Sequence, residues 1–289
     1  MDRAEGGLAR QREQRPGGIL GSELALRIGS AVVLIPVAVG SAYAGGPLFL
    51  AVWAIVASVI FWEWMALLGR SKQRLAIGGE AAVFFAAAAL FWLGWAGAAL
   101  ALLAIGALAV AGLSLGSRPG WVLAGGIYAA AMIAAPATLR RDAEWGFLAL
   151  LSLFAVVWTT DIMAYFVGRA LAGPKLWPAV SPKKTWSGAI GGAVAATGVG
   201  TGVAALAGLD RLGTLALLFA CLSVAAQGGD LLESALKRHF GAKNASELIP
   251  GHGGMMDRLD GFVAAALAAS VLGLVRGGLD APGRGLLVW

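Results

Sequence analysis

One group of residues that could do chemistry stands near the end of a long apolar run. Its members share one face of a helix, where a carboxylate and a hydroxyl lie one to two turns from two cations. They are Asp230, Ser234, Lys237 and Arg238. The group could simply be a self-neutralising helix end whose long basic side chains reach a polar boundary. It could also be a site that binds a charged ligand.

The segment that follows favours a site. Pro250-Gly251-His252-Gly253-Gly254 is a permissive turn, whose glycines let backbone N–H groups approach a phosphate. It leads to two carboxylates, Asp257 and Asp260, with Arg258 between them. Carboxylates beside basic residues suit Mg²⁺ and phosphate oxygens, because Mg²⁺ usually takes one or two protein carboxylates. A zinc site is excluded, since the sequence has only two His and one Cys, widely spaced.

A second polar group lies some 50 to 70 residues earlier, at the end of another apolar run. It consists of Asp161, Tyr165 and Arg169 at helical spacing, followed by Ser181, Lys183, Lys184 and Thr185. For the two lysines the alternative is that they only mark the cytoplasmic side of a membrane. Glu63, between two tryptophans, is expected to be structural or substrate-lining and not catalytic.

These motifs resemble phosphatidate cytidylyltransferases (CDP-diacylglycerol synthases). The resemblance is close over residues 158–262 and loose over the rest of the chain, where Trp62-Glu63-Trp64 also fits weakly. It is carried by Asp161-x-x-Ala164-Tyr165-Phe166-x-Gly168-Arg169, Ser181-Pro182-Lys183-Lys184-Thr185, Ser234-x-x-Lys237-Arg238, Lys243-Asn244, Pro250-Gly251-His252-Gly253-Gly254 and Asp257-Arg258-x-Asp260. The sequence departs from the family pattern at three places: Asn244 replaces the usual Asp, Ser187 replaces a frequent Glu or Gln, and Ala245-Ser246-Glu247 is unusual for the loop.

The resemblance implies transfer of CMP from CTP to phosphatidic acid, giving CDP-diacylglycerol and pyrophosphate with Mg²⁺ as cofactor. It implies metal ligands at Asp230 and Asp257, with Asp260 as a supporting carboxylate. The catalytic residues would be Asp230, Lys237, Arg238, His252, Asp257 and Arg258. The substrate-binding residues would be Asp161, Tyr165, Arg169, Ser181, Lys183, Lys184, Thr185, Ser234, Lys243, Asn244, Gly253 and Gly254.

The elements that hold these residues must lie in a membrane. Of the 289 residues, 59% are hydrophobic and 13% are charged, whereas soluble domains have about 45–50% and about 25%. No charged residue lies between Glu80 and Arg118, a run long enough for two bilayer crossings. The composition excludes a disordered chain, a nucleic-acid-binding domain and an ordinary soluble enzyme. It predicts an all-α, polytopic integral membrane protein.

Apolar runs predict nine transmembrane helices. They are 27–44, 48–68, 79–95, 97–116, 120–138, 146–168, 187–208, 212–232 and 261–279. We expect a disordered cytoplasmic tail (1–22), an N-terminal transmembrane region (23–145) and a C-terminal catalytic region (146–289) with cytoplasmic loops 169–186 and 233–260. A cleaved signal peptide ending near Ala44 is a less favoured alternative, because the polar segment before it is too long.

The basic residues predict the orientation. With the N-terminus inside, 17 of the 22 Lys and Arg residues lie in cytoplasmic segments and 5 lie outside. The expected location is therefore the cell membrane, a bacterial inner membrane, with the active site facing cytoplasmic CTP. The lipid bilayer is the main partner, nucleic acid is not one, and a homodimer is left open. The remaining alternatives are a CTP-dependent lipid-alcohol kinase and a transporter, although no internal repeat favours the latter.

Overall fold

The computed structural model describes residues 32–114, 118–246, 248 and 253–289. Within these ranges, eight helices are long and apolar enough to cross a membrane. Helices are expected here because a spanning segment must satisfy its backbone hydrogen bonds internally. They are α2 (Gly46–Leu67), α3 (Arg74–Trp92), α4 (Ala96–Leu113), α5 (Pro119–Arg140), α6 (Gly146–Leu171), α7 (Trp186–Leu206), α8 (Leu212–His239) and α9 (Met256–Gly277).

The all-α, polytopic fold is thus confirmed, and each of the eight helices matches one predicted from the sequence. Of the first predicted span, 27–44, the described part forms the helix Val32–Ala44, and its beginning lies outside the described residues. The predicted tail, 1–22, also lies outside them. A short helix after the last span, α10 (Pro282–Leu287), was not predicted.

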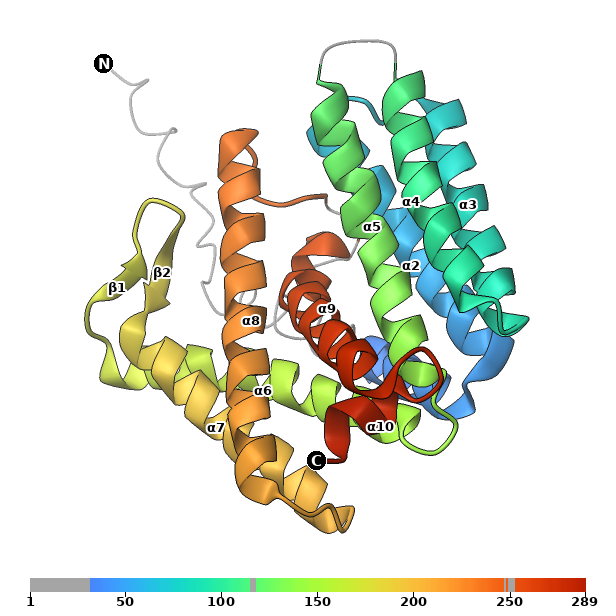
Figure 1. Ribbon diagram of the computed structural model, residues 1–289. Helices are drawn as coiled ribbons and strands as arrows, with labels where there is room; N and C mark the ends of the chain where they lie inside the picture. Colours follow the sequence, from blue (N-terminus) through green and yellow to red (C-terminus); the bar gives the residue numbers. More distant parts are fainter. Residues whose placement is uncertain (1–31, 115–117, 247, 249–252) are drawn as a thin grey trace, which may run out of the picture.

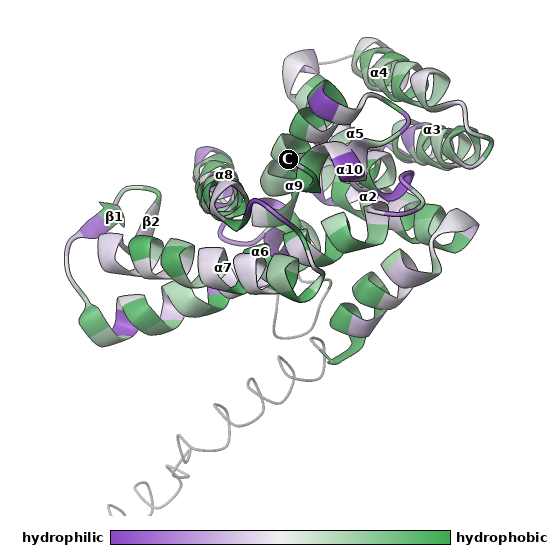
Figure 2. Cartoon of the chain, turned by 60° about the horizontal axis from the view of Figure 1, so that its bottom comes forward, coloured by the Kyte–Doolittle hydropathy of each residue, from purple (hydrophilic) through white to green (hydrophobic). Residues whose placement is uncertain are grey.

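The helices form two groups that meet at α9. Helices α2 to α5 pack against one another, α6 packs on α7, α7 on α8, and α9 lies between α8 and α5 (Figure 1). Apolar residues cover most of each helix, and hydrophilic ones gather mainly at helix ends and in connecting segments (Figure 2). The Phe262 ring of α9 stacks on Trp53 of α2 (5.1 Å) and on Phe154 of α6 (5.3 Å). This aromatic stack joins the two groups.

Helices α6 and α7 approach each other closely, because glycines of α7 stand where the two helices meet. A Cβ atom at Gly188 would lie 2.6 Å from the Ala164 carbonyl oxygen, and one at Gly192 would lie 2.7 Å from that of Thr160. Association in lipid depends on such packing and not on the hydrophobic effect. The contact fixes the end of α6, which carries Asp161 and Tyr165, against the start of α7.

The two cytoplasmic loops predicted from the sequence are shorter than expected, and one is partly folded. Helix α8 continues through His239, so residues 233–239 are helical, and α9 already begins at Met256. The segment 169–186 contains the last turn of α6 and an antiparallel hairpin, β1 (Lys175–Trp177) and β2 (Ser181–Thr185). The predicted boundaries were wrong because hydropathy reports where a helix leaves lipid, not where it ends.

Candidate active site

A cavity of about 790 Å³ opens where α6, α8, α9 and the hairpin meet. A concave site with converging charged groups is the usual form of a ligand-binding pocket. Both polar groups identified in the sequence contribute to its wall. The predicted residues that line it are Asp161, Tyr165, Arg169, Lys183, Lys184, Thr185, Asp230, Lys237, Asn244, Asp257, Arg258 and Asp260.

Other predicted site residues lie outside the cavity wall. Arg238 is exposed and donates a hydrogen bond to the Ala242 carbonyl oxygen (3.3 Å). His252 lies outside the described residues. The remaining ones that do not line the cavity are Ser181, Ser234, Lys243, Gly253 and Gly254. Conversely, Lys175 and Gln227 line it but were not among the predicted site residues. Gln227 could have been identified because it lies three residues before Asp230, on the same face of the helix.

An ion pair links the two polar groups. Lys184 of β2 pairs with Asp230 of α8, and both side chains are partly exposed to the cavity. Ser234, one turn further along α8, donates a hydrogen bond to Asp230 Oδ1 at 3.4 Å. Ser234 can therefore affect the cavity through its contact with Asp230, although its own side chain does not line the cavity.

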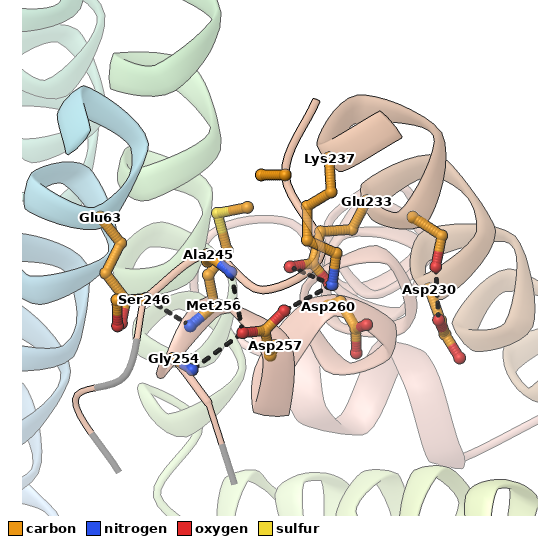
Figure 3. Close-up of polar contacts among 12 residues, drawn as sticks. Glu63, Asp230, Glu233, Lys237, Ala245, Ser246, Gly254, Met256, Asp257 and Asp260 are labelled. Carbon is orange, nitrogen blue, oxygen red and sulfur yellow. Dashed lines mark hydrogen bonds and ion pairs between the residues drawn. The ribbon is translucent and has the colours of Figure 1, made fainter. Parts of the chain in front are cut away.

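A buried charge cluster lies deeper, between α8 and α9 (Figure 3). Lys237 Nζ lies 2.5 Å from Asp257 Oδ1 and 3.3 Å from Glu233 Oε1. The exposed fractions of these side chains are 11% for Lys237, 8% for Asp257 and 1% for Glu233. Because removing one partner of such a cluster leaves an uncompensated buried charge, its members depend on one another. Glu233 was not among the predicted site residues.

The second oxygen of Asp257 holds the backbone of the segment between α8 and α9. Oδ2 accepts the N–H groups of Ala245 (3.0 Å) and Gly254 (2.8 Å). Gly253 has φ +84°, and a Cβ there would lie 2.9 Å from Asp257 Oδ2. The glycines were expected to bring N–H groups to a phosphate, but the Gly254 N–H group is used by Asp257.

A carboxylate from the other helix group reaches the same place. Glu63 of α2 is fully buried, and it accepts hydrogen bonds from the Met255 and Met256 N–H groups and from the Ser246 hydroxyl. Figure 3 shows it on the opposite side of the chain from Lys237. Glu63 therefore holds the chain that leads into α9 and does not line the cavity.

The end of α6 faces the cavity with both charge signs. Asp161 lines the cavity together with Asp230, Asp260, Lys184 and Arg258, so three carboxylates and two cations share its wall. Arg169 Nη1 donates a hydrogen bond to the Tyr165 hydroxyl (3.0 Å). This region can therefore hold a ligand that carries both a bound cation and negative charge.

The start of α7 is fixed by local hydrogen bonds. The Thr185 side chain caps the helix by accepting the Gly188 N–H group (3.1 Å). Ser187, which departs from the family pattern, donates a hydrogen bond to the Ala172 carbonyl oxygen and so ties the helix to the end of α6. The residue that differs from the family pattern therefore has a structural contact in this protein.

Carboxylate oxygens are the donors that Mg²⁺ prefers, and four carboxylates line the cavity, so its chemistry suits this ion. In the described part of the chain, no three His, Cys, Asp or Glu side chains are arranged as a ready metal cluster. Asp230 and Asp257 each pair with a lysine. A cation bound by either would compete with Lys184 or Lys237, and those lysines would then be available to phosphates.

Comparisons with known proteins agree with the motifs. Residues 25–275 match the model of the "Cytidylyltransferase family". A "Phosphatidate cytidylyltransferase" of Brucella suis is 41% identical over 273 residues, which are 90% of this chain and 97% of the relative. Proteins of the same name from Bacillus subtilis and Staphylococcus haemolyticus are each 43% identical, over 43% and 39% of this chain and 47% and 44% of theirs. The chain therefore belongs to the cytidylyltransferase family.

Proposed function

We propose that the protein transfers CMP from CTP to phosphatidic acid, giving CDP-diacylglycerol and pyrophosphate for phospholipid biosynthesis. One observation carries this function: the two motif groups, far apart in the sequence, line a single charged cavity at the end of membrane-spanning helices. A site there is accessible both to a charged nucleotide and to the head group of a lipid. The likeness to relatives of that name over nearly the full chain supports the same reaction.

The chemistry requires little from the protein beyond positioning and charge neutralisation. An oxygen of the lipid phosphate attacks the α-phosphorus of CTP, a P–O bond forms, and the bond to the β-phosphate breaks to release pyrophosphate. Because this oxygen is already ionised near neutral pH, no general base is needed. Cations placed around an in-line displacement then supply most of the catalysis.

The cavity residues divide into two roles. Asp230 and Asp257, with Asp260 in support, would hold Mg²⁺, which neutralises triphosphate charge when bound. Lysines and arginines that line the cavity would hold phosphates; they are Arg169, Lys175, Lys183, Lys184, Lys237 and Arg258. Arg238 and Lys243, which do not line it, would meet only the outer part of a bound substrate.

The cavity is proposed to face the cytoplasm, where CTP is made. The 17 basic residues of the expected cytoplasmic segments, against 5 outside, support this orientation. The bacterial relatives support a location in an inner membrane. A homodimer stays a prediction.

A label-transfer assay tests the function. Purified protein is incubated with Mg²⁺, phosphatidic acid and CTP labelled at either the α- or the γ-phosphorus. The proposed reaction places the α-label in lipid and releases the γ-label as pyrophosphate. In a parallel reaction with a polyprenol in place of phosphatidic acid, a lipid-alcohol kinase would transfer the γ-label to the alcohol. A transporter would label no lipid with either acceptor, so either result would refute the proposal.

A further inference from the structure

Glu63 lies on α2, outside the cavity and in the helix group that supplies none of its lining residues. We infer that it is a positioning residue for the reaction, acting through Asp257. The inference rests on the proposed function, because the position of Asp257 affects turnover only if this cavity is the active site.

The hydrogen bonds of Glu63 place both of its oxygens on the chain around the start of α9. Oε2 accepts the Met256 N–H group at 2.7 Å, and Oε1 accepts the Met255 N–H group at 2.8 Å and the Ser246 hydroxyl at 2.5 Å. The approach leaves no room at Gly254, where a Cβ would lie 2.6 Å from Oε1. A carboxylate at this place also interacts favourably with the positive end of the α9 dipole.

Glu63 and Asp257 hold the same two stretches of chain. Asp257 binds the N–H groups of Ala245 and Gly254, and Glu63 binds the neighbouring groups of Ser246 and Met255. Each stretch is therefore fixed by two carboxylates. If Glu63 were lost, Asp257 alone would hold both stretches while also pairing with Lys237.

The three donors require the negative charge of Glu63, which makes both of its oxygens acceptors. A glutamine would direct an NH₂ group at chain N–H donors, whereas one carboxylate accepts all three hydrogen bonds. A buried N–H group left without an acceptor costs free energy, so the start of α9 would shift until it found one. Asp257 stands in the first turn of α9 and would move with it.

The test compares Glu63→Gln, Glu63→Asp and the control Glu80→Gln in the full-length enzyme. Glu80 is a second buried carboxylate of the same helix group, on α3. For Glu63→Gln, kcat should fall about 100-fold, because a displacement of about 1 Å at a reacting centre can cause a loss of that size. The KM for phosphatidic acid should stay within about threefold of the wild-type value. Glu63→Asp, which keeps the charge, should recover most of kcat, and Glu80→Gln should leave it unchanged.

A second readout follows the chain directly. Lys243 is exposed and lies in a non-helical segment, so the rate of tryptic cleavage after it reports how firmly the adjacent Ala245 and Ser246 are held. Cleavage should be faster in Glu63→Gln and unchanged in Glu80→Gln. Should Glu63→Gln fail to fold, Ser246→Ala removes one contact only and should lower kcat about fivefold.

Two results would overturn the inference. One is wild-type kcat in a folded Glu63→Gln or Ser246→Ala enzyme. The other is a loss of kcat without faster cleavage after Lys243. The cleavage assay does not depend on substrate, so it separates a failure of this inference from a failure of the proposed reaction, which would leave even the wild-type protein inactive.

Discussion

At the scale of single residues, Asp230 and Asp257 both line the cavity and are both proposed to hold Mg²⁺, but they differ in their other contacts. Within the described part of the chain, Asp230 contacts two side chains, those of Lys184 and Ser234. Asp257 binds Lys237 and two backbone N–H groups. The two aspartates are thus expected to fail in different ways when they are changed.

We predict that Asp230→Asn and Asp257→Asn each lower kcat by about 10²-fold or more at saturating Mg²⁺, because each removes charge from the triphosphate site. Only Asp257→Asn should also speed tryptic cleavage after Lys243. Turnover and cleavage are measured on the same preparations. Near-wild-type turnover in either variant would remove that residue from the site.

Asn244 lines the cavity where the family usually has Asp. We predict that Asn244→Asp changes kcat and the Mg²⁺ requirement less than about threefold. Asp230, Asp257 and Asp260 already supply more carboxylates than Mg²⁺ normally takes from a protein, and an amide oxygen accepts hydrogen bonds as a carboxylate does. A Mg²⁺ titration of both forms is the measurement. A gain of tenfold, about 1.4 kcal/mol of barrier, would show that the missing charge matters.

At the scale of secondary-structure elements, the close contact of α6 with α7 is the feature on which the cavity wall depends. Gly188 is buried in this contact, whereas Gly198 of the same helix has no described atom within 4 Å of an added Cβ. The two glycines form a matched pair for testing the contact.

We predict that Gly188→Ala destabilises the protein by about 1–3 kcal/mol, since its Cβ would force the helices apart. Gly198→Ala should be neutral or slightly stabilising, because alanine is the better helix former. Thermal unfolding of the purified proteins gives the comparison. Equal Tm values for the two variants would contradict the close packing.

The sequence predicted the spans well and their ends poorly. Apolar runs of about 20 residues are a direct consequence of bilayer thickness, so eight predicted spans have a helix in the structure. The extension of α8 to His239 was missed because charged residues after Leu232 resemble a loop by hydropathy, although they form helical pairs such as Glu233 with Lys237. The hairpin within 169–186 was not predicted, because its residues lack the alternation of apolar and polar side chains that is typical of a strand.

The site was predicted to a similar extent. The resemblance to the family motifs identified most residues that line the cavity. The contacts of Glu63 could not be predicted, because its partners lie 183 to 193 residues away and meet it only through the packing of α2 near α9. Nor could the motifs reveal that Asp257 binds the chain as well as facing the cavity.

At the scale of the whole molecule, the orientation in the membrane decides which side supplies the nucleotide. The hairpin and the junction of α7 with α8 lie at opposite ends of α7. Ala179 in the hairpin and Asp210 at the junction are both exposed, so a cysteine at either can report the side on which it lies.

We predict that Ala179→Cys, in a Cys221→Ser background, resists a membrane-impermeant thiol reagent in intact cells and reacts in inverted vesicles. Asp210→Cys should show the opposite pattern. Replacing Cys221 is necessary because it is exposed on α8. Labelling of Ala179→Cys from outside would reverse the orientation and exclude cytoplasmic CTP as the substrate of this cavity.

The contact of Glu63 with the start of α9 also sets an order of assembly during synthesis. Met256 is made 193 residues after Glu63, which takes roughly 10 to 40 s at ordinary rates of translation. Throughout that time the hydrogen-bond acceptors of Glu63 lack the N–H groups that satisfy them in the finished protein. The arrival of α9 supplies these donors and completes the cavity wall in one event, so a nascent chain that stops before α9 is expected to lack both the Glu63 contact and the site.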